Sequence, residues 1–217
     1  MPEPGRRQAR SALRRQQIIQ AALVCLTEHG SSQTTMETIQ RRSGASNGTI
    51  YHFFKSKEQL AAAVYLEGIA DYQSYLEAEL ERCREARDGV LSVPRSHLRW
   101  VHEHFEWARF LFQARHAQFM ATSETSMAEQ NSAFAGSIAR WFARHVEKGS
   151  LKRLPPDLYI SFLLGPCQEF TRLWVSGWAR TPLSTASEAF GEAAWQALRT
   201  EEGQNPQGQK LEGQREE

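Results

Sequence analysis

Apolar residues recur along this chain at the spacing of one helical face. The first stripe returns to the same side of a helix once per turn, and its members are Ile18, Ile19, Ala22, Leu23 and Leu26. This stripe predicts a first helix over residues 14–29. A second stripe begins at Leu60 and predicts a long helix that starts near Lys57 and runs past Leu80.

The second half of the chain continues the helical pattern. Helices are expected over residues 92–118, 124–148, 156–179 and 184–201, because breaks rich in Gly, Ser, Thr or Pro separate these stretches. No segment of four to eight residues shows sustained alternation with β-branched enrichment, so no sheet is expected and the predicted fold class is all-α. The first ten residues, and a tail of Gly, Gln and charge over residues 203–217, have little to bury and are expected to be disordered.

Residues 34–57 predict two short helices joined by a tight turn. Thr34 begins a Thr-x-x-Glu capping box for the first of them. Gly44 stands where that helix should end, in a left-handed conformation that Gly adopts at little cost. Ser46 is placed to cap the next helix, and Ile50 gives that helix an apolar side.

The outer side of this second helix carries short polar groups, an imidazole and a phenol. They are Asn47, Thr49, Tyr51 and His52. Lysines follow just past its end, and such a helix suits a DNA major groove flanked by phosphates. Helix pairs joined by Gly also occur in proteins that never contact DNA, so a second feature is needed to decide.

Positive charge is concentrated in the same part of the chain. Residues 1–60 hold nine Lys or Arg and four acids, a net charge of +5, whereas the whole chain is +1. Contacts to phosphate supply most non-specific DNA affinity and reward this arrangement. A solvated basic face is the alternative for runs such as Arg14-Arg15, while Arg6, Arg7 and Arg10 could lie along DNA.

The motif content is denser than a generic helix pair. The chain has Gly30, Thr34-Thr35 and Ile39, then Gly-Ala-Ser-Asn-Gly-Thr-Ile-Tyr-His-Phe-Phe from Gly44, then Lys-Ser-Lys-Glu-Gln-Leu. Residues 14–66 therefore resemble the DNA-binding domain of the tetracycline-repressor (TetR) family. That family's pattern continues from Thr-Thr to Gly-Val-Ser-x-Gly-Thr-Leu-Tyr-x-x-Phe and Lys-x-Lys-x-x-Leu. Gln40 and Ala45 depart from it, where the family often has Ala and Val.

The resemblance implies a domain order and a function. A basic arm over residues 1–10 would precede a three-helix helix-turn-helix domain over 11–58. A helical-bundle domain for ligand binding and dimerisation would follow over 59–202. Such a protein is expected to be a sequence-specific transcriptional regulator, a ligand-responsive repressor that binds a palindromic operator on double-stranded DNA as a homodimer.

The resemblance also implies which residues meet the DNA. Those expected to position the protein on phosphates are Thr34, Thr35, Tyr51, His52 and Lys57. Those expected at base edges are Asn47, Gly48 and Tyr51. Thr49 could serve either role, and Ser46 is expected to contact the DNA from the start of the helix. Gly48 matters because a side chain there would hold the backbone off the DNA.

The second half is aromatic, with all six tryptophans beyond residue 99. Plain core packing accounts for most of them, but the resemblance implies a pocket for a small apolar or aromatic effector. The residues expected to line it are Trp100, His104, Trp107, Phe110, Arg115, Trp141, Phe170 and Trp174. His104 or Arg115 would supply a polar contact. The residues expected at a dimer interface between the last two helices are Leu158, Phe162, Phe190 and Trp195.

Nothing in the sequence argues for catalysis. There is no Gly-rich phosphate loop, nucleophile elbow or Cys-His signature, so no catalytic residue, no cofactor and no metal site are expected. Two alternatives stay open: a helical small-molecule sensor without working DNA binding, and a metal-assisted enzyme at the His-rich helix around His104. No apolar run reaches membrane-spanning length and no signal segment is evident, so no membrane partner and a cytoplasmic location are expected.

Overall fold

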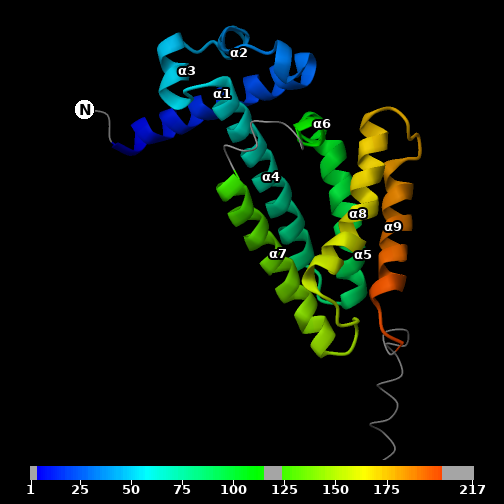
Figure 1. Ribbon diagram of the computed structural model, residues 1–217. Helices are drawn as coiled ribbons and strands as arrows, with labels where there is room; N and C mark the ends of the chain where they lie inside the picture. Colours follow the sequence, from blue (N-terminus) through cyan, green and yellow to red (C-terminus); the bar gives the residue numbers. More distant parts are fainter. Residues whose placement is uncertain (1–3, 115–123, 202–217) are drawn as a thin grey trace, which may run out of the picture. The chain divides into compact units, whose positions relative to one another are not determined.

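The computed structural model describes residues 4–114 and 124–201 of the 217-residue chain (Figure 1). Within these ranges the regular structure is helical, apart from one isolated antiparallel bridge between Leu151 and Arg199. The predicted all-α class is therefore confirmed. The helices are α1 (Pro4–Gln33), α2 (Met36–Ser43), α3 (Asn47–Phe53), α4 (Lys57–Glu81), α5 (Ala86–Glu103), α6 (Phe105–Ala114), α7 (Glu124–Glu147), α8 (Pro156–Val175) and α9 (Leu183–Leu198).

The helices belong to two compact units. The first draws on residues 1–71 and 104–129, and the second on 72–103 and 130–217. Helix α4 thus belongs to the first unit up to Asp71 and to the second from Tyr72. The expected boundary at residue 58 differs from this division, because the start of α4 and the whole of α6 pack with the first three helices.

The core of the first unit is built on the apolar stripe of α1. Ile18 and Ile19 are fully buried, and they pack with Ile39 of α2, Ile50 of α3 and Phe110 of α6. Burying a branched aliphatic side chain contributes roughly 1.5–3 kcal/mol, so this stripe holds the short helices α2 and α3 in place. The stripe and the helix pair are therefore confirmed as the sequence predicts them.

Helix α1 is longer than the sequence suggests. It begins at Pro4, within the stretch predicted to be a disordered arm, and residues 5–13 are helical with exposed side chains. Arg, Gln, Ala and Leu all have good helix propensity, so the helix extends toward the N-terminus beyond its packed part. The expected end near residue 29 is close, because Gly30 leaves helical geometry with φ of 74°.

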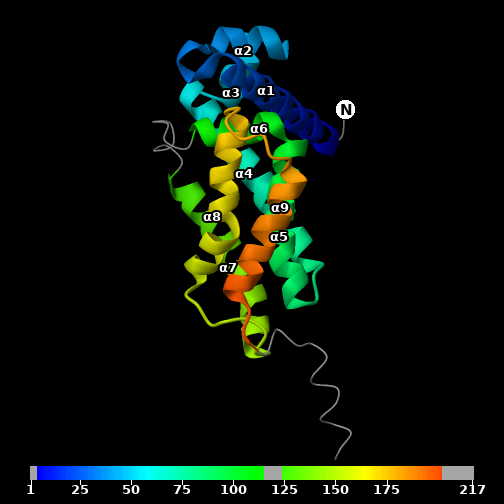
Figure 2. The same ribbon diagram turned by 90° about the vertical axis from the view of Figure 1, so that its right-hand side faces the viewer.

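The second unit combines parts of α4 and α7 with α5, α8 and α9. Figures 1 and 2 both show α5 and α8 running beside α9, and these are extensively packed pairs. The sequence predicts that this helix begins at residue 92, after a break rich in Gly, Ser and Pro, but α5 begins at Ala86 and buries both Gly89 and Pro94. The ring of Trp141 lies where a Cβ on Gly89 would be, 2.1 Å from the nearest ring atom, so this Gly serves packing rather than a helix end.

Candidate DNA-binding surface and effector region

The start of α2 is capped one residue later than the sequence suggests. Thr35 is the N-cap: its hydroxyl accepts the N–H of Thr38 at 3.1 Å, and its own N–H reaches Thr38 Oγ1 at 3.3 Å. Thr34 is buried, and its hydroxyl lies 2.9 Å from the carbonyl oxygen of Cys25 and 2.8 Å from that of Gly30. The prediction that Thr34 contacts phosphate is therefore wrong. Its side chain satisfies carbonyl groups left open where α1 breaks.

The turn between α2 and α3 has the predicted conformation. Gly44 is left-handed, with φ of 60° and ψ of 20°. Ser46 caps α3, accepting the N–H of Thr49 at 3.2 Å, and the two hydroxyl oxygens are 2.7 Å apart. The hydroxyls of Ser46 and Thr49 are thus partly engaged within the chain before any DNA is bound.

Helix α3 presents the outer face that the sequence predicts. Asn47, Gly48, Tyr51 and His52 are all exposed, while Ile50 on the opposite side is buried. A Cβ added at Gly48 would meet nothing within 4 Å among residues 4–114 and 124–201. Packing in this part of the chain therefore does not require Gly here, and the backbone of α3 is open to close approach from outside.

Several cations of the first unit are used to hold it together. Lys57 Nζ donates to the carbonyl oxygen of Ser31 at 2.7 Å, and Lys55 Nζ donates to that of Tyr51 at 3.1 Å. An ammonium has three N–H donors, so the bond to Ser31 leaves Lys57 able to reach a phosphate as well. The predicted DNA role of Lys57 stays a prediction.

Two arginines of α1 have structural roles that the sequence analysis did not foresee. Arg14 donates to the carbonyl oxygens of Gly44 at 2.6 Å and Ser43 at 3.3 Å, and so fixes the turn that leads into α3. Arg15 lies 3.5 Å from the carboxylate of Glu67, with its guanidinium carbon 5.4 Å from the centre of the Phe54 ring. The alternative of a merely solvated basic face is therefore wrong for Arg14, whereas the Arg15 side chain stays exposed.

The predicted effector residues are not gathered in one unit. Those in the first unit are His104, Trp107 and Phe110, and those in the second are Trp100, Trp141, Phe170 and Trp174. Arg115 lies outside the described residues. Phe110 packs in the first core, and Trp107 covers Gly68, where a Cβ would lie 2.4 Å from its ring. For these two residues the structure supports the core-packing alternative within the first unit.

A chain of buried polar groups crosses the second unit. The hydroxyl of Tyr72 on α4 is 2.7 Å from Nδ1 of His97 on α5, whose Nε2 is 3.0 Å from Oγ1 of Thr171 on α8. All three side chains are buried. Burial lowers the pKa of His97 to about 4 and raises that of Tyr72, so both groups are neutral near pH 7. Hydrophobic periodicity carries no signal for such a contact between helices.

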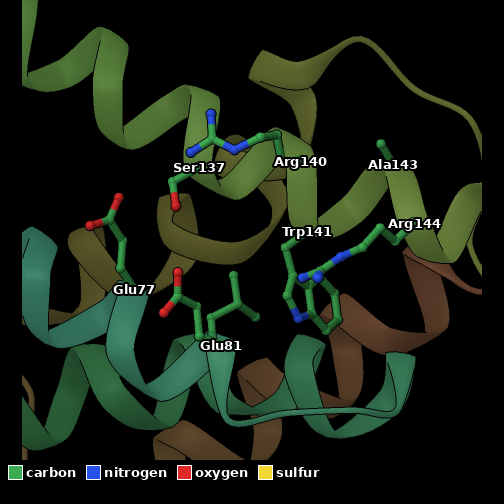
Figure 3. Close-up of a pocket in the computed structure, with 8 residues that line it drawn as sticks. Glu77, Glu81, Ser137, Arg140, Trp141, Ala143 and Arg144 are labelled. Carbon is green, nitrogen blue, oxygen red and sulfur yellow. The ribbon is translucent and has the colours of Figure 1, made fainter.

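The second unit also has a partly open pocket of about 430 Å³ between α4 and α7 (Figure 3). Carboxylates of Glu77 and Glu81 line it from α4, and guanidinium groups of Arg140 and Arg144 line it from α7. Trp141 is its aromatic wall, fixed because its indole N–H donates to the carbonyl oxygen of Cys83 at 3.3 Å. Its volume suits a small molecule, but its charged lining suits a polar one rather than the apolar effector predicted.

The predicted dimer residues divide into two groups. On α8, Leu158 and Phe162 are 38% and 44% exposed, as residues of an interface would be in a single chain. Phe190 on α9 is half-buried and meets the ring of Phe170 edge-on, with centroids 5.6 Å apart. Trp195 is buried, so it packs within its own chain and its predicted role at an interface is wrong.

Two features of the described residues bear on metal binding and on membrane association. Among residues 4–114 and 124–201, no three His, Cys, Asp or Glu side chains are grouped so that they could hold a metal ion. In the same ranges, no helix combines the length and the apolar character needed to cross a membrane.

The comparisons with known proteins add to this geometry. Residues 18–64, which run from the packed part of α1 into α4, match the model of the bacterial regulatory proteins of the tetR family. Residues 18–64 are a DNA-binding domain of the tetR-family type. The match covers the core of the helix-turn-helix domain, from the buried stripe of α1 to the start of α4. This domain, formed by α1, α2 and α3, is called here the reader.

Proteins similar to this chain are known by sequence and by structure. The fatty acid metabolism regulator protein of Bacillus subtilis (strain 168) is 28% identical over 81 residues, which span 37% of this chain and only 42% of that relative. The HTH-type transcriptional regulator BetI of Proteus mirabilis (strain HI4320) is 26% identical over 193 residues, spanning 84% of this chain and 86% of the relative.

Among solved structures, the transcriptional regulator FadR from Bacillus subtilis, crystallised in complex with stearoyl-CoA, superposes with a TM-score of 0.71. The two chains are 21% identical, and the match covers 82% of this chain and 96% of that one. At this level of identity the likeness shows a shared fold.

Proposed function

We propose that this TetR-family chain is a repressor that binds a palindromic operator as a homodimer and responds to a small-molecule effector. The observation that carries the proposal is the outer face of α3, where Asn47, Gly48 and Tyr51 are exposed at the end of a capped turn. The same helix buries Ile50 in the core, so this face is held rigidly and turned outward.

Each exposed group has a contact for which its chemistry is suited. Asn47 can donate and accept at once, the pairing that reads the edge of an adenine in the major groove. Gly48 lets the helix backbone approach a base or sugar closely. Thr35, Tyr51, His52 and Lys57 supply donors to phosphate oxygens, which fix the register of the reader on the duplex.

Dimerisation supplies the symmetry of the site. Two readers related by a two-fold axis meet successive major grooves when their centres lie about 34–36 Å apart. The exposed apolar residues Leu158 and Phe162 on α8 support an interface that pairs α8 and α9 with the same helices of a second chain. An operator read in this way is a palindrome.

Control by an effector is proposed to act through α4. This helix contributes to both units, so a ligand bound by the second unit changes a helix that the reader also uses. A ligand can shift the reader only if it binds the DNA-competent and incompetent arrangements with unequal affinity. The Bacillus subtilis regulator FadR, which shares this fold, was crystallised in complex with stearoyl-CoA, and this supports a small-molecule ligand for the present chain.

The proposal is tested by selecting bound fragments from random duplex DNA at near-physiological salt. We expect the purified full chain to recover a palindrome. The variant Tyr51→Ala, which removes one donor from the exposed face of α3, should recover far less DNA while melting at the same temperature. Recovery of no sequence above background by the unmodified chain would overturn the proposed function.

A further inference from the structure

Helix α1 extends well beyond the part that packs in the core. Residues 5–13, called here the α1 extension, are helical, and every side chain in them is exposed. Even Leu13, an apolar residue, is 60% exposed. The extension is therefore not held in place by burial, and its side chains are free to meet molecules in the solvent.

Three arginines of the extension share one face of the helix with Arg14. At about 100° per residue, Arg6, Arg7, Arg10 and Arg14 fall within an arc of roughly 100°. Arg14 reaches the carbonyl oxygens of Ser43 and Gly44, in the turn that leads into α3. The arginine stripe therefore lies on the side of α1 that faces the turn between α2 and α3.

These three arginines differ from most of the lysines and arginines around the helix-turn-helix. Arg14, Arg15, Arg42, Lys55 and Lys57 all donate to, or pair with, groups of the same chain. No ion pair or hydrogen bond is found for the side chains of Arg6, Arg7 and Arg10 within the described ranges. The extension thus carries positive charge that the fold itself does not use.

The placement of this charge disfavours the isolated helix. The first turn of α1 contains no acidic residue, and cations near a helix N-terminus are repelled by its dipole. Arg6 and Arg10 are four residues apart, as are Arg10 and Arg14, and like charges at this spacing destabilise a helix. A polyanion along the stripe would remove both kinds of repulsion, since it neutralises all three guanidinium groups together.

We propose that the α1 extension is a second DNA-binding site, a helical arm whose Arg6, Arg7 and Arg10 bind phosphates of the operator beside the major groove that α3 reads. The inference rests on the proposed function, because the DNA that α3 binds is the polyanion brought to this face. From Arg14 back to Arg6 the helix rises about 12 Å, enough to follow about three phosphates of one strand. The arm adds affinity but reads no bases.

The test is the salt dependence of DNA affinity, measured with the full chain on its selected operator and on an unrelated duplex. The variant is Arg6→Gln/Arg7→Gln/Arg10→Gln. The control, Arg84→Gln/Arg95→Gln/Arg180→Gln, makes the same charge change at exposed positions of the second unit. Each phosphate contact contributes about 0.9 to the slope of log affinity against log salt. A dimer carries two arms with three arginines each, so the arm variant should lose about 5.4 from this slope on both duplexes.

We expect the arm variant to select the same operator sequence and to melt no lower than the unmodified protein, while the control keeps the native slope. A native slope in the arm variant, with a palindrome still selected, would overturn the arm and leave the proposed function standing. An altered sequence preference would overturn it too, because phosphate contacts do not specify sequence. If the unmodified chain binds neither duplex, the arm and the proposed function fail together.

Discussion

At the scale of single residues, the reader depends on which groups the fold has already engaged. Thr34 and Thr35 are adjacent and chemically identical, yet Thr34 is buried against carbonyl groups of α1 and Thr35 caps α2 in solvent. Only Thr35 has a hydroxyl near the surface, so of the two it alone is a candidate for contact with phosphate. Burial decides this difference, and the residue type does not.

Two glycines make a matched test of function against stability. Gly48→Ala places a methyl group where the chain leaves open space, and Ala favours a helix over Gly by roughly 0.5–1 kcal/mol. We expect an equal or slightly higher melting temperature, but about a tenfold or greater loss of operator affinity, the order of one lost base contact. Thermal melts and binding titrations measure both.

The control for this prediction is Gly89→Ala. Its Cβ would lie 2.1 Å from the Trp141 ring, so overpacking should destabilise the second unit by about 1–3 kcal/mol or more. The surface of the reader is untouched, so the folded fraction should bind the operator normally. Native operator affinity in the Gly48→Ala variant would show that α3 does not approach the DNA through this residue.

At the scale of helices, a buried polar chain ties α4, α5 and α8 together in the second unit. His97 accepts or donates on both ring nitrogens, to Tyr72 and to Thr171. A buried group that loses its partner costs about 1–3 kcal/mol, so this chain favours one arrangement of the three helices over others. It is therefore a feature that an effector-induced change in α4 has to preserve or break.

The pKa of His97 makes stability depend on pH in a definite direction. It is lowered to about 4 by burial in the folded protein, against about 6.5 in the unfolded chain. Between these values the unfolded chain binds more protons, so the free energy of unfolding falls as pH falls from 6.5 to 4. The total loss from this group is roughly 3 kcal/mol.

Denaturant unfolding at several pH values measures the effect, with His97→Gln as the comparison. The variant should lose most of the decline between pH 6.5 and 4. His145, whose pKa is also lowered by burial, remains in both proteins, so the difference between the two profiles isolates His97. Identical slopes in the two proteins would mean that His97 is not buried as a neutral group.

At the scale of the whole molecule, the proposed function requires a second copy of the chain. Leu158 and Phe162 are exposed apolar residues on α8, and their burial between two chains would remove them from water. We expect sedimentation at micromolar concentration to give a dimer of the 24.7 kDa chain. The double variant Leu158→Asp/Phe162→Asp should sediment as a monomer and lose most of its affinity for a palindrome.

Leu13→Asp is the control for this prediction. Leu13 is more exposed than either α8 residue, at 60%, and it lies on the α1 extension in the first unit. The same chemical change there should leave the dimer intact. A native protein that sediments only as a monomer would remove the geometric basis for a palindromic operator.

Local patterns in the sequence determined the all-α class, the buried stripe of α1, the left-handed Gly44, the cap at Ser46 and the outward face of α3. These features depend on neighbours within a few residues, where periodicity and capping chemistry operate. Composition did not determine every helix end: Gly89 and Pro94 have the composition of a break, yet both lie inside α5.

Only the tertiary structure decided which side chains of distant segments meet. It buried Thr34 and Trp195, paired Arg14 with the turn before α3, and joined Tyr72, His97 and Thr171 across three helices. It also divided the predicted effector residues between two units. The sequence could not show this division, since an aromatic ring suits a core as well as a pocket. Such choices depend on contacts between residues far apart in the chain, and no local pattern encodes them.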